Sequence, residues 1–568
     1  MQLPPRFRGR WRSLAMAVLV ASSSPAALEA QGSSSAPASV PAAMSRFRGG
    51  DPVGAARILE SVTSAEPQNV SAWRLLGLCY RKSGDLDRAR SAYDRAMTLE
   101  PGSATTTFDL AGVYALQNKT DSAFALLARV RASHNYDMTQ LDVDSAYATL
   151  RADPRYKPLL PTAADFANPF VEHVKVLLEI DGDSSGDQFG WIARSIGDVD
   201  RDGVFDFVTS APTRNVGGPN AGRVSAYSSR TGKLLWNADG KPGEQLGTGL
   251  ESAGDVDGDG AEDVIAGAPY AGRAYVYSGR DGRTLFTLRA ENDSDAFGQH
   301  VSSAGDVDHD GHADFLVGAP SNNAGGRGAG RAYLYSGRDG HLLLTLTGER
   351  AGDAFGSTVG GYSDAKRTFI VVGAPSAGGG KAGRTYVYDG LSQKPKFIIE
   401  SDSTGNALGA MFVSVMGDVD GDGVPDIYAS DFTNAAKGQS TGRIYVHSGN
   451  NGKRLVTLTG EGAGEGFGIG PGKTGDVDHD GHADLVVGSW QYSNGATSGG
   501  RVYLYSGRDG HLIKTYTDRI PGDTFGFDAV GIGDVDGDGD VDFLVTAAWS
   551  GVHGNHSGRI FIVSSGVK

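Results

Sequence analysis

Cysteine and long apolar runs are nearly absent from this sequence. Cys79 is the single cysteine in 568 residues. One thiol allows no internal disulfide and no zinc site built from cysteines. The apolar run at residues 13–21 is too short to span a bilayer, which takes about 20 residues. We therefore expect no transmembrane segment and an inert, buried thiol at Cys79.

Positive charge is also scarce relative to negative charge. The chain has 52 lysines and arginines against 67 aspartates and glutamates, and its formal net charge is −15. A surface of this sign repels phosphate backbones and anionic membranes. We expect no nucleic-acid partner, and we expect cations or basic surfaces to be favoured.

Glycine, in contrast, is abundant. There are 84 glycines, together with 21 tyrosines and 22 phenylalanines. The glycines have no three-residue period, which excludes collagen. Glycine excess with many aromatic residues is typical of short strands that are joined by tight turns.

The N-terminal 30 residues have the pattern of a signal peptide. Arg6, Arg8, Arg10 and Arg12 precede the apolar run, and small residues follow it up to position 30. This order of basic, apolar and small residues predicts cleavage and export. We expect a secreted, periplasmic or cell-surface protein, with a Ser/Pro/Ala-rich linker at residues 31–43.

Residues 44–160 have the spacing of tetratricopeptide repeats. The best 34-residue unit carries all eight key residues, namely Trp73, Leu76, Gly77, Tyr80, Ala89, Tyr93, Ala96 and Pro101. Weaker copies lie on both sides, and three repeats are about the minimum for a stable stack. We expect an all-α module that binds a protein or a peptide.

Residues 172–568 repeat seven times with a period of roughly 50 to 60 residues. Each unit opens with Phe-Gly or Leu-Gly, and its second strand ends in Gly-Ala-Pro or a variant of it. The opening pairs are Phe189-Gly190, Leu246-Gly247, Phe297-Gly298, Phe355-Gly356, Leu408-Gly409, Phe467-Gly468 and Phe525-Gly526. Four strands per unit predict an all-β, seven-bladed propeller.

These motifs resemble the FG-GAP repeats of integrin α-subunit heads. The last unit lacks a fourth strand, and residues 174–180 match one. We therefore expect the strand at 174–180 to complete the seventh blade, so that the ring has no open edge.

Six loops have the pattern Asp-x-Asp-x-Asp-Gly-x-x-Asp. Carboxylates at positions 1, 3, 5 and 9 and a main-chain carbonyl at position 7 form an all-oxygen set that suits calcium, with magnesium as the alternative. The predicted ligands are Asp198, Asp200, Asp202, Val204 and Asp206 in blade 1; Asp255, Asp257, Asp259, Ala261 and Asp263 in blade 2; Asp306, Asp308, Asp310, His312 and Asp314 in blade 3; Asp418, Asp420, Asp422, Val424 and Asp426 in blade 5; Asp476, Asp478, Asp480, His482 and Asp484 in blade 6; and Asp534, Asp536, Asp538, Asp540 and Asp542 in blade 7.

Blade 4 departs from this pattern. Its corner is Asp364-Ala365-Lys366-Arg367, with two cations in place of carboxylates. We expect six calcium ions and none in blade 4. His312 and His482 occupy position 7 of their loops, where the main-chain oxygen binds the ion, so we expect their rings to face water.

One arginine recurs at the start of each third strand, which indicates a structural role in pairing with carboxylates or carbonyls of a neighbouring blade. These residues are Arg223, Arg273, Arg331, Arg384, Arg443, Arg501 and Arg559. No unique catalytic motif stands outside the repeats, so we assign no catalytic residue.

The resemblance and the loops favour an exported, calcium-binding interaction or adhesion protein. A protein or glycan ligand would contact the face opposite the calcium loops, where Tyr270, Phe432, Trp490, Tyr492 and Trp549 are candidate contacts. One alternative is an extracellular enzyme resembling a glycan lyase or a phospholipase, which would need a unique charged cluster at the propeller axis. Another is an assembly factor of the cell envelope that works through its helical repeats.

The signal-peptide pattern makes a direct prediction. N-terminal sequencing of the native protein should show a chain that begins near residue 31, because the apolar run and the small residues after it direct cleavage there. Native protein that begins at Met1 would contradict the prediction.

Overall fold

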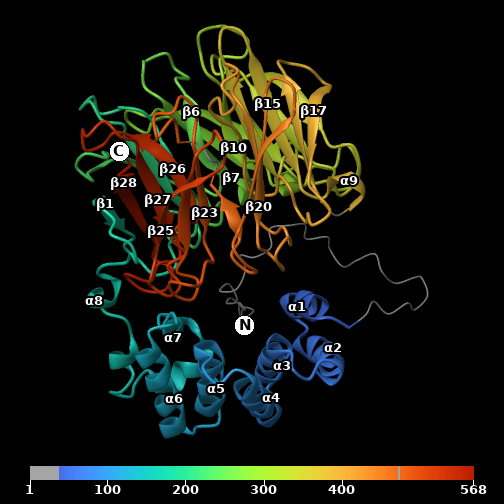
Figure 1. Ribbon diagram of the computed structural model, residues 1–568, viewed down its shortest axis with the longest axis vertical. Coiled ribbons are helices and arrows are strands. Elements are labelled where there is room, and N and C mark those ends of the chain that lie inside the picture. Colours follow the sequence, from blue (N-terminus) through green and yellow to red (C-terminus); the bar gives the residue numbers. More distant parts are fainter. Residues whose placement is uncertain (1–37, 381, 471–473, 568) are drawn as a thin grey trace, which may run out of the picture. The chain divides into compact units, whose positions relative to one another are not determined.

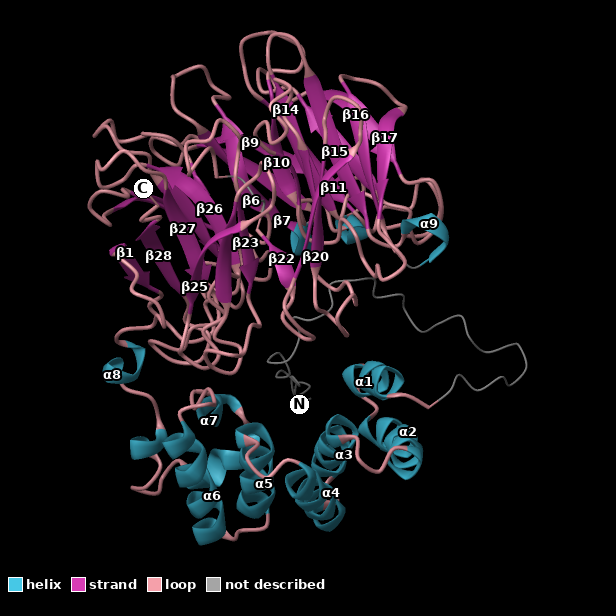
Figure 2. Ribbon diagram, in the orientation of Figure 1, coloured by secondary structure: helices cyan, strands magenta, loops and turns pink. Residues whose placement is uncertain are grey.

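Two units of different secondary structure make up the described part of the chain. The computed structural model describes residues 38–380, 382–470 and 474–567, and it divides between Pro161 and Thr162. Helices form the first unit and strands dominate the second (Figures 1 and 2). This confirms the predicted fold class. The predicted signal peptide, residues 1–30, lies outside the described residues.

The first unit is built from three helical pairs and a short tail. The helices are α1 (Val40–Arg48), α2 (Pro52–Ala65), α3 (Val70–Ser83), α4 (Leu86–Leu99), α5 (Ala104–Leu116), α6 (Thr120–Ser133), α7 (Gln140–Val143), and the 3-10 helices η1 (Ser145–Leu150) and η2 (Lys157–Leu159). Across the described segments of the whole chain, no helix has the length and apolarity to cross a membrane.

Local side chains start the helices, and a glycine lets one pair pack closely. Asn69 accepts a hydrogen bond from the N–H of Ala72 at 2.9 Å, so it caps α3. A Cβ atom at Gly77 would lie 2.7 Å from the ring of Tyr93 on α4, which only glycine avoids. Cys79 is fully buried, and burial raises the pKa of its thiol to about 12, as expected of a packing residue.

The helical unit begins earlier than the sequence pattern suggests. Residues 40–43, which were predicted to belong to a linker, form the first turn of α1. The Ser39 hydroxyl accepts from the N–H of Ala42, and Pro41 fits the first turn because no intrahelical donor is needed there. A Ser/Pro/Ala-rich stretch therefore serves here as a helix start.

The second unit contains, in the ranges described, seven antiparallel sheets of four strands. A short helix α8 (Ala163–Phe166) precedes them. The strands of blades 1 to 3 are β2 (Ala193–Ser195), β3 (Phe207–Ala211), β4 (Arg223–Tyr227), β5 (Leu234–Asp239); β6 (Leu250–Gly254), β7 (Asp263–Ala268), β8 (Arg273–Tyr277), β9 (Thr284–Arg289); and β10 (Val301–Gly305), β11 (Asp314–Ala319), β12 (Arg331–Tyr335), β13 (Leu342–Thr347).

Blades 4 to 7 repeat the same order. Their strands are β14 (Thr358–Ser363), β15 (Thr368–Ala374), β16 (Arg384–Asp389), β17 (Pro395–Glu400); β18 (Val413–Val415), β19 (Ile427–Asp431), β20 (Arg443–His447), β21 (Arg454–Thr459); β22 (Phe467–Ile469), β23 (Leu485–Ser489), β24 (Arg501–Tyr505), β25 (Leu512–Thr517); and β26 (Asp528–Gly533), β27 (Asp542–Ala547), β28 (Arg559–Ser564), β1 (Val176–Asp181). Short helices η3 (Pro269–Ala271), η4 (Asp293–Asp295) and α9 (Ala377–Gly380) lie in the loops.

The second strand of each blade is buried along its whole length. Every residue of β7, β11 and β27 is buried, for example, and the fourth strands are the most exposed. At five of the seven junctions the first strands of neighbouring blades contact one another, so the first strands lie closest to the propeller axis. The loops between first and second strands therefore share one face of the propeller.

The seventh blade is closed by the strand that lies first in the sequence. β1 pairs antiparallel with β28, with Asp181 opposite Arg559. Arg559 is 2% exposed and forms ion pairs with Glu179 and with Asp181, the latter at 3.0 Å. The strand spans Val176–Asp181, two residues later at its start than the 174–180 segment of the sequence analysis.

Two truncations test this closure. A chain without residues 1–161 keeps α8 and β1. Its propeller should have the same melting temperature as the propeller in the full-length chain. A chain without residues 1–182 loses β1, which exposes the edge of β28 and removes two carboxylates from buried Arg559. Its melting temperature, measured by calorimetry, should be lower by many degrees, and equal melting of the two chains would contradict the closure.

Candidate metal centres

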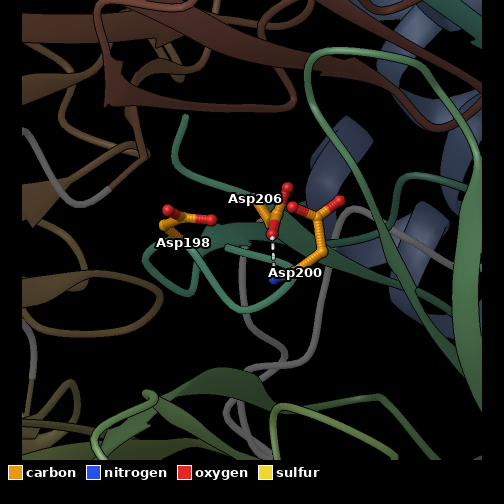
Figure 3. Close-up of side chains that lie close together, drawn as sticks. All are labelled: Asp198, Asp200 and Asp206. Atoms are coloured by element: carbon orange, nitrogen blue, oxygen red, sulfur yellow. Dashed lines mark hydrogen bonds between the residues drawn. The ribbon is translucent and has the colours of Figure 1, made fainter. Parts of the chain in front are cut away.

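Aspartate-rich loops join the first and second strands in six of the seven blades. In blade 1 the loop lies between β2 and β3, and the carboxylates of Asp198, Asp200 and Asp206 point toward a common centre (Figure 3). One carboxylate oxygen from each of these residues lies within 4.8 Å of those of the other two. Three negative groups at this separation repel one another unless a cation lies between them.

The same convergence recurs around the ring. The other named groups within this distance are Asp255, Asp257 and Asp259; Asp306, Asp308 and Asp314; Asp418, Asp420 and Asp426; and Asp476, Asp478 and Asp484. In blade 7, Gly537 and Gly539 donate to Asp534 and Val535 donates to Asp542, the hydrogen bonds that also shape the loop of blade 5. Asp clusters thus occur in several blades.

Main-chain donors hold each loop in shape. In blade 1 both oxygens of Asp198 accept N–H groups, from Asp202 at 3.0 Å and Gly203 at 2.9 Å. Asp202 in turn accepts from Val204 at 2.9 Å. These bonds turn the chain around the cluster, and Gly203 has a φ of 88°, which glycine adopts without strain. The spacing of the aspartates therefore shapes the loop and places its carboxylates.

The aspartate at position 9 is fully buried in all six loops. In blade 2, Asp263 accepts the N–H groups of Val256, in the loop, and of Gly279, at the end of β8. Burial raises the pKa of Asp206, Asp263, Asp314 and Asp542 to about 6 and that of Asp426 to about 7, and it also raises the pKa of Asp484. This carboxylate connects the loop to the third strand.

One buried carboxylate oxygen tests whether the loops fit a cation. Oδ1 of Asp308, in the blade 3 cluster, is buried and has no hydrogen-bond donor among the described residues. Such an oxygen is costly unless a proton or a cation satisfies it. The donor set is otherwise carboxylate and carbonyl oxygen, the set preferred by hard divalent cations. The residues present therefore fit calcium or magnesium.

Basic side chains from the turn between third and fourth strands border the loops. Arg230 lies 3.2 Å from Asp202, Arg280 lies 2.8 Å from Asp259, and Arg283 lies 2.5 Å from Asp257. Lys175 pairs with Asp536. Sequence analysis missed these residues, although Ser-Gly-Arg-Asp-Gly recurs at 278–282, 336–340 and 506–510 and could have indicated them. They offset part of the negative charge from outside each cluster.

The corner of blade 4 is a tight turn with one carboxylate. Asp364 accepts the N–H groups of Lys366 at 2.7 Å and Arg367 at 2.8 Å. The guanidinium of Arg367 points to the next blade and donates to the carbonyl of Gly423 at 2.6 Å. This cation lies against the aspartate loop of blade 5.

The expectation that His312 and His482 face water is wrong. His312 Nδ1 donates to the carbonyl of Val256 at 2.8 Å, and His482 Nδ1 donates to the carbonyl of Val419 at 2.9 Å. Both rings are half-buried against the loop of the preceding blade. The sequence pattern describes one loop at a time, whereas the ring places neighbouring loops side by side.

The recurring arginines form ion pairs, but within their own blade or with the connection that enters it. The pairs are Arg223 with Asp239, Arg273 with Glu244, Arg331 with Glu291, Arg384 with Glu400, Arg443 with Asp402, Arg501 with Glu461, and Arg559 with Glu179 and Asp181. The expected pairing with a neighbouring blade is therefore wrong, because the fourth strand of the same blade and the connection that enters the blade are nearer.

Of the five aromatic residues predicted to contact a ligand, Tyr270 is the exposed one, at 56%. Trp490 and Tyr492 are buried, with exposures of 4% and 3%. Trp549 and Phe432 are half-buried, and Trp549 stacks on His556 with centroids 5.3 Å apart. Most of this set packs the edges of blades 5 to 7.

Charged residues outside the repeats' pattern meet near the axis. Arg194 of blade 1 donates to Glu251 of blade 2 at 2.9 Å and pairs with Asp528 of blade 7. Arg194 and Asp528 are 4% and 1% exposed. His300 of blade 3 lies nearby, and burial lowers its pKa to about 4. The sequence pattern gave no sign of this cluster, because it joins different blades and Arg194 and Asp528 are 334 residues apart.

Comparison with known proteins agrees with these repeats. Tetratricopeptide repeat families match residues 40–104 and 80–153. The FG-GAP repeat family matches residues 251–282 and 297–335, and an FG-GAP-like repeat family matches 418–487 and 476–545. The chain thus combines tetratricopeptide repeats with a seven-bladed propeller that contains FG-GAP repeats.

Curated relatives share part of the propeller sequence. Phosphatidylinositol-glycan-specific phospholipase D of Mus musculus is 32% identical over 181 residues, which cover 28% of this chain and 21% of that protein. Integrin alpha-4 of Xenopus laevis is 30% identical over 196 residues, 31% of this chain and 18% of that protein. Integrin alpha-IIb of Homo sapiens is 34% identical over 161 residues, 25% of this chain and 15% of that protein. The chain therefore spans about a fifth of the length of these relatives or less.

The axial ion pairs predict a large effect on stability. Arg194→Met should lower the free energy of unfolding by roughly 3 kcal/mol, because it leaves the buried Asp528 carboxylate without its partner. Denaturant unfolding of the full chain measures the change. Arg289→Met, at an exposed position on β9, is the matched control and should change it by less than about 0.5 kcal/mol. Equal effects would contradict the role of the axial pairs.

Proposed function

We propose that this protein is an exported, calcium-dependent interaction or adhesion protein. Its propeller would be a rigid platform stabilised by calcium, and its helical repeats would bind a second protein. The observation that carries the proposal is the convergence of three carboxylates in at least five loops of one ring, all on the face where first and second strands connect. FG-GAP similarity to integrin α subunits supports the same assignment.

Calcium suits these loops better than magnesium. Four aspartates and a main-chain carbonyl offer five oxygens or more, and a flexible loop tolerates the six to eight ligands of calcium. Magnesium needs near-ideal octahedral geometry and retains several waters. We propose one ion each in blades 1, 2, 3, 5, 6 and 7 and none in blade 4, where Asp364 is the single carboxylate of the corner.

Each ligand position would have a distinct task. In blade 1, Asp198, Asp200 and Asp202 would coordinate the ion from the loop, and the carbonyl of Val204 would complete that side. Buried Asp206 would bind from the strand side while keeping its bonds to the loop N–H groups. The ion supplies positive charge that offsets carboxylate repulsion, and the chain supplies the geometry.

Partners would bind away from the ions. The connections between second and third strands lie on the face opposite the aspartate loops, and Tyr270 is exposed there. An exposed aromatic ring offers a contact for a protein or a sugar. The helical unit would bind a protein or a peptide, as tetratricopeptide repeats commonly do.

Two alternative functions, an enzyme and an assembly factor, can each be tested directly. An enzymatic role has two observations in its favour. One is the charged cluster of Arg194, Glu251, Asp528 and His300 near the axis. The other is the similarity to phosphatidylinositol-glycan-specific phospholipase D, in which the matched region covers 21% of that protein. Release of a glycosylphosphatidylinositol-anchored protein by the purified chain would support it. For an assembly factor led by the helical repeats, removing residues 36–160 should abolish partner retention in pull-downs from exported material.

Calcium removal should destabilise the propeller. At a calcium concentration tenfold above the Kd, each site contributes about 1.4 kcal/mol by mass action, so several sites amount to a large share of a domain's stability. Chelation should lower the melting temperature by many degrees, and calcium should restore it better than magnesium. Differential scanning calorimetry measures both effects.

Point variants test the number and place of the ions. Isothermal titration at saturating calcium should count six ions in the intact chain and five in Asp257→Ala. The control, Asp364→Ala in blade 4, should leave the count at six. A count near zero, or melting that ignores the chelator, would refute the proposal.

A further inference from the structure

Two pairs of neighbouring aspartate loops are joined by the same two hydrogen bonds. The N–H of Ala313 in blade 3 donates to the carbonyl of Asp255 in blade 2 at 2.9 Å, and His312 Nδ1 donates to Val256 at 2.8 Å. In blades 6 and 5, Ala483 donates to Asp418 at 2.9 Å, and His482 Nδ1 donates to Val419 at 2.9 Å. The arrangement thus occurs twice, at loops far apart in the sequence.

These bonds involve the residues that carry the ligands. Asp255 is the first aspartate of the blade 2 loop, and its main-chain carbonyl is held by blade 3. His312 is position 7 of the blade 3 loop, and its side chain reaches the blade 2 loop, where its ring lies against Gly258. An interaction that orders the main chain of one loop therefore also orders, through these hydrogen bonds, a segment of the other loop that carries metal ligands.

Three other junctions are connected differently. Between blades 6 and 7 the contact joins two side chains, His479 and Asp540, at 3.4 Å. Between blades 3 and 4, the hydroxyl of Ser363 donates to Asp306 at 2.8 Å, and blade 4 has one carboxylate at its corner. Between blades 4 and 5, Arg367 contacts Gly423. None of these contacts links the main chains of two aspartate loops.

We propose that the calcium sites of blades 2 and 3, and those of blades 5 and 6, bind their ions as cooperative pairs. The inference rests on the proposed calcium function. An ion that orders one loop fixes the donors or acceptors of the shared bonds, so the partner loop binds the next ion in a conformation that is already ordered. The blade 7 site then binds independently of the pair in blades 2 and 3.

Charge does not oppose this pairing. Each loop of the two pairs has four aspartates, so one bound divalent ion leaves two negative charges, which Arg280 and Arg283 balance in blade 2. A loaded loop therefore does not repel the cation of its neighbour. Cooperative pairs would make the aspartate face of the propeller respond to calcium over a narrower concentration range than six independent sites.

Amide hydrogen exchange of the full chain, titrated with calcium, resolves the loops one by one. In Asp308→Asn, which removes a ligand in blade 3, the calcium concentration for half-protection of residues 255–263 in blade 2 should rise roughly fivefold or more. Because coupling between two binding sites is reciprocal, Asp257→Asn in blade 2 should raise the midpoint of residues 306–314 by the same factor.

The matched control removes the same ligand from a loop that does not adjoin blade 2. Asp536→Asn in blade 7 should leave the midpoint of residues 255–263 unchanged. His312→Ala keeps every carboxylate and should reduce the coupling between blades 2 and 3, whereas His309→Ala, at an exposed position of the same loop, should not. Asp478→Asn in blade 6, read at residues 418–426, repeats the test if a blade 3 variant does not fold.

The outcomes separate the two proposals. Calcium protection of the loops with a blade 2 midpoint that is the same in Asp308→Asn and in the unchanged chain would overturn the pairing and leave the calcium function intact. Absence of protection in every loop at millimolar calcium would overturn the calcium function, and the pairing with it.

Discussion

Neighbouring blades of this propeller touch backbone to backbone, and the rest of the structure depends on that close approach. At four junctions, the glycine of the second strand faces the carbonyl of the next blade's opening glycine, and a Cβ atom there would collide with it. Gly267 against Gly298 and Gly318 against Gly356 are two examples. The opening glycines also have positive φ values, which other residues rarely adopt. An opening glycine in every repeat, and a facing second-strand glycine at four junctions, thus allow seven twisted sheets to form one ring.

Close blades bring the aspartate loops close as well. Each loop satisfies part of its own charge by main-chain donors, and arginines from the turn between third and fourth strands offset more from outside. The buried position 9 aspartates and the unpaired oxygen of Asp308 leave negative charge inside the clusters that a bound cation would balance. The same geometry that packs the sheets therefore creates both the binding sites and the contacts between them.

The region near the propeller axis and the face that carries the aspartate loops use charge in opposite ways. Near the axis, Arg194, Glu251 and Asp528 satisfy one another and join blades 7, 1 and 2. On the loop face, like charges converge and depend on an added cation. The outer rim of blade 7 uses strand pairing together with ion pairs. β1 closes the sheet by hydrogen bonds and supplies two carboxylates to buried Arg559. Stability at the ring's junction is therefore shared between chain topology and ion pairs.

Local repetition let the sequence by itself determine the helical repeats, the seven-bladed propeller and the aspartate loops. The eight-residue pattern around Trp73, the Phe-Gly and Gly-Ala-Pro markers and the aspartate spacing each describe a turn or a packing contact within about 60 residues, so they are readable without coordinates. Only the tertiary structure decided what those units touch. It turned the rings of His312 and His482 to neighbouring loops, buried Trp490 and Tyr492, and joined Arg194 to Asp528 across 334 residues. Such contacts depend on how the sheets close into a ring, and no local pattern encodes a partner that lies several blades away along the chain.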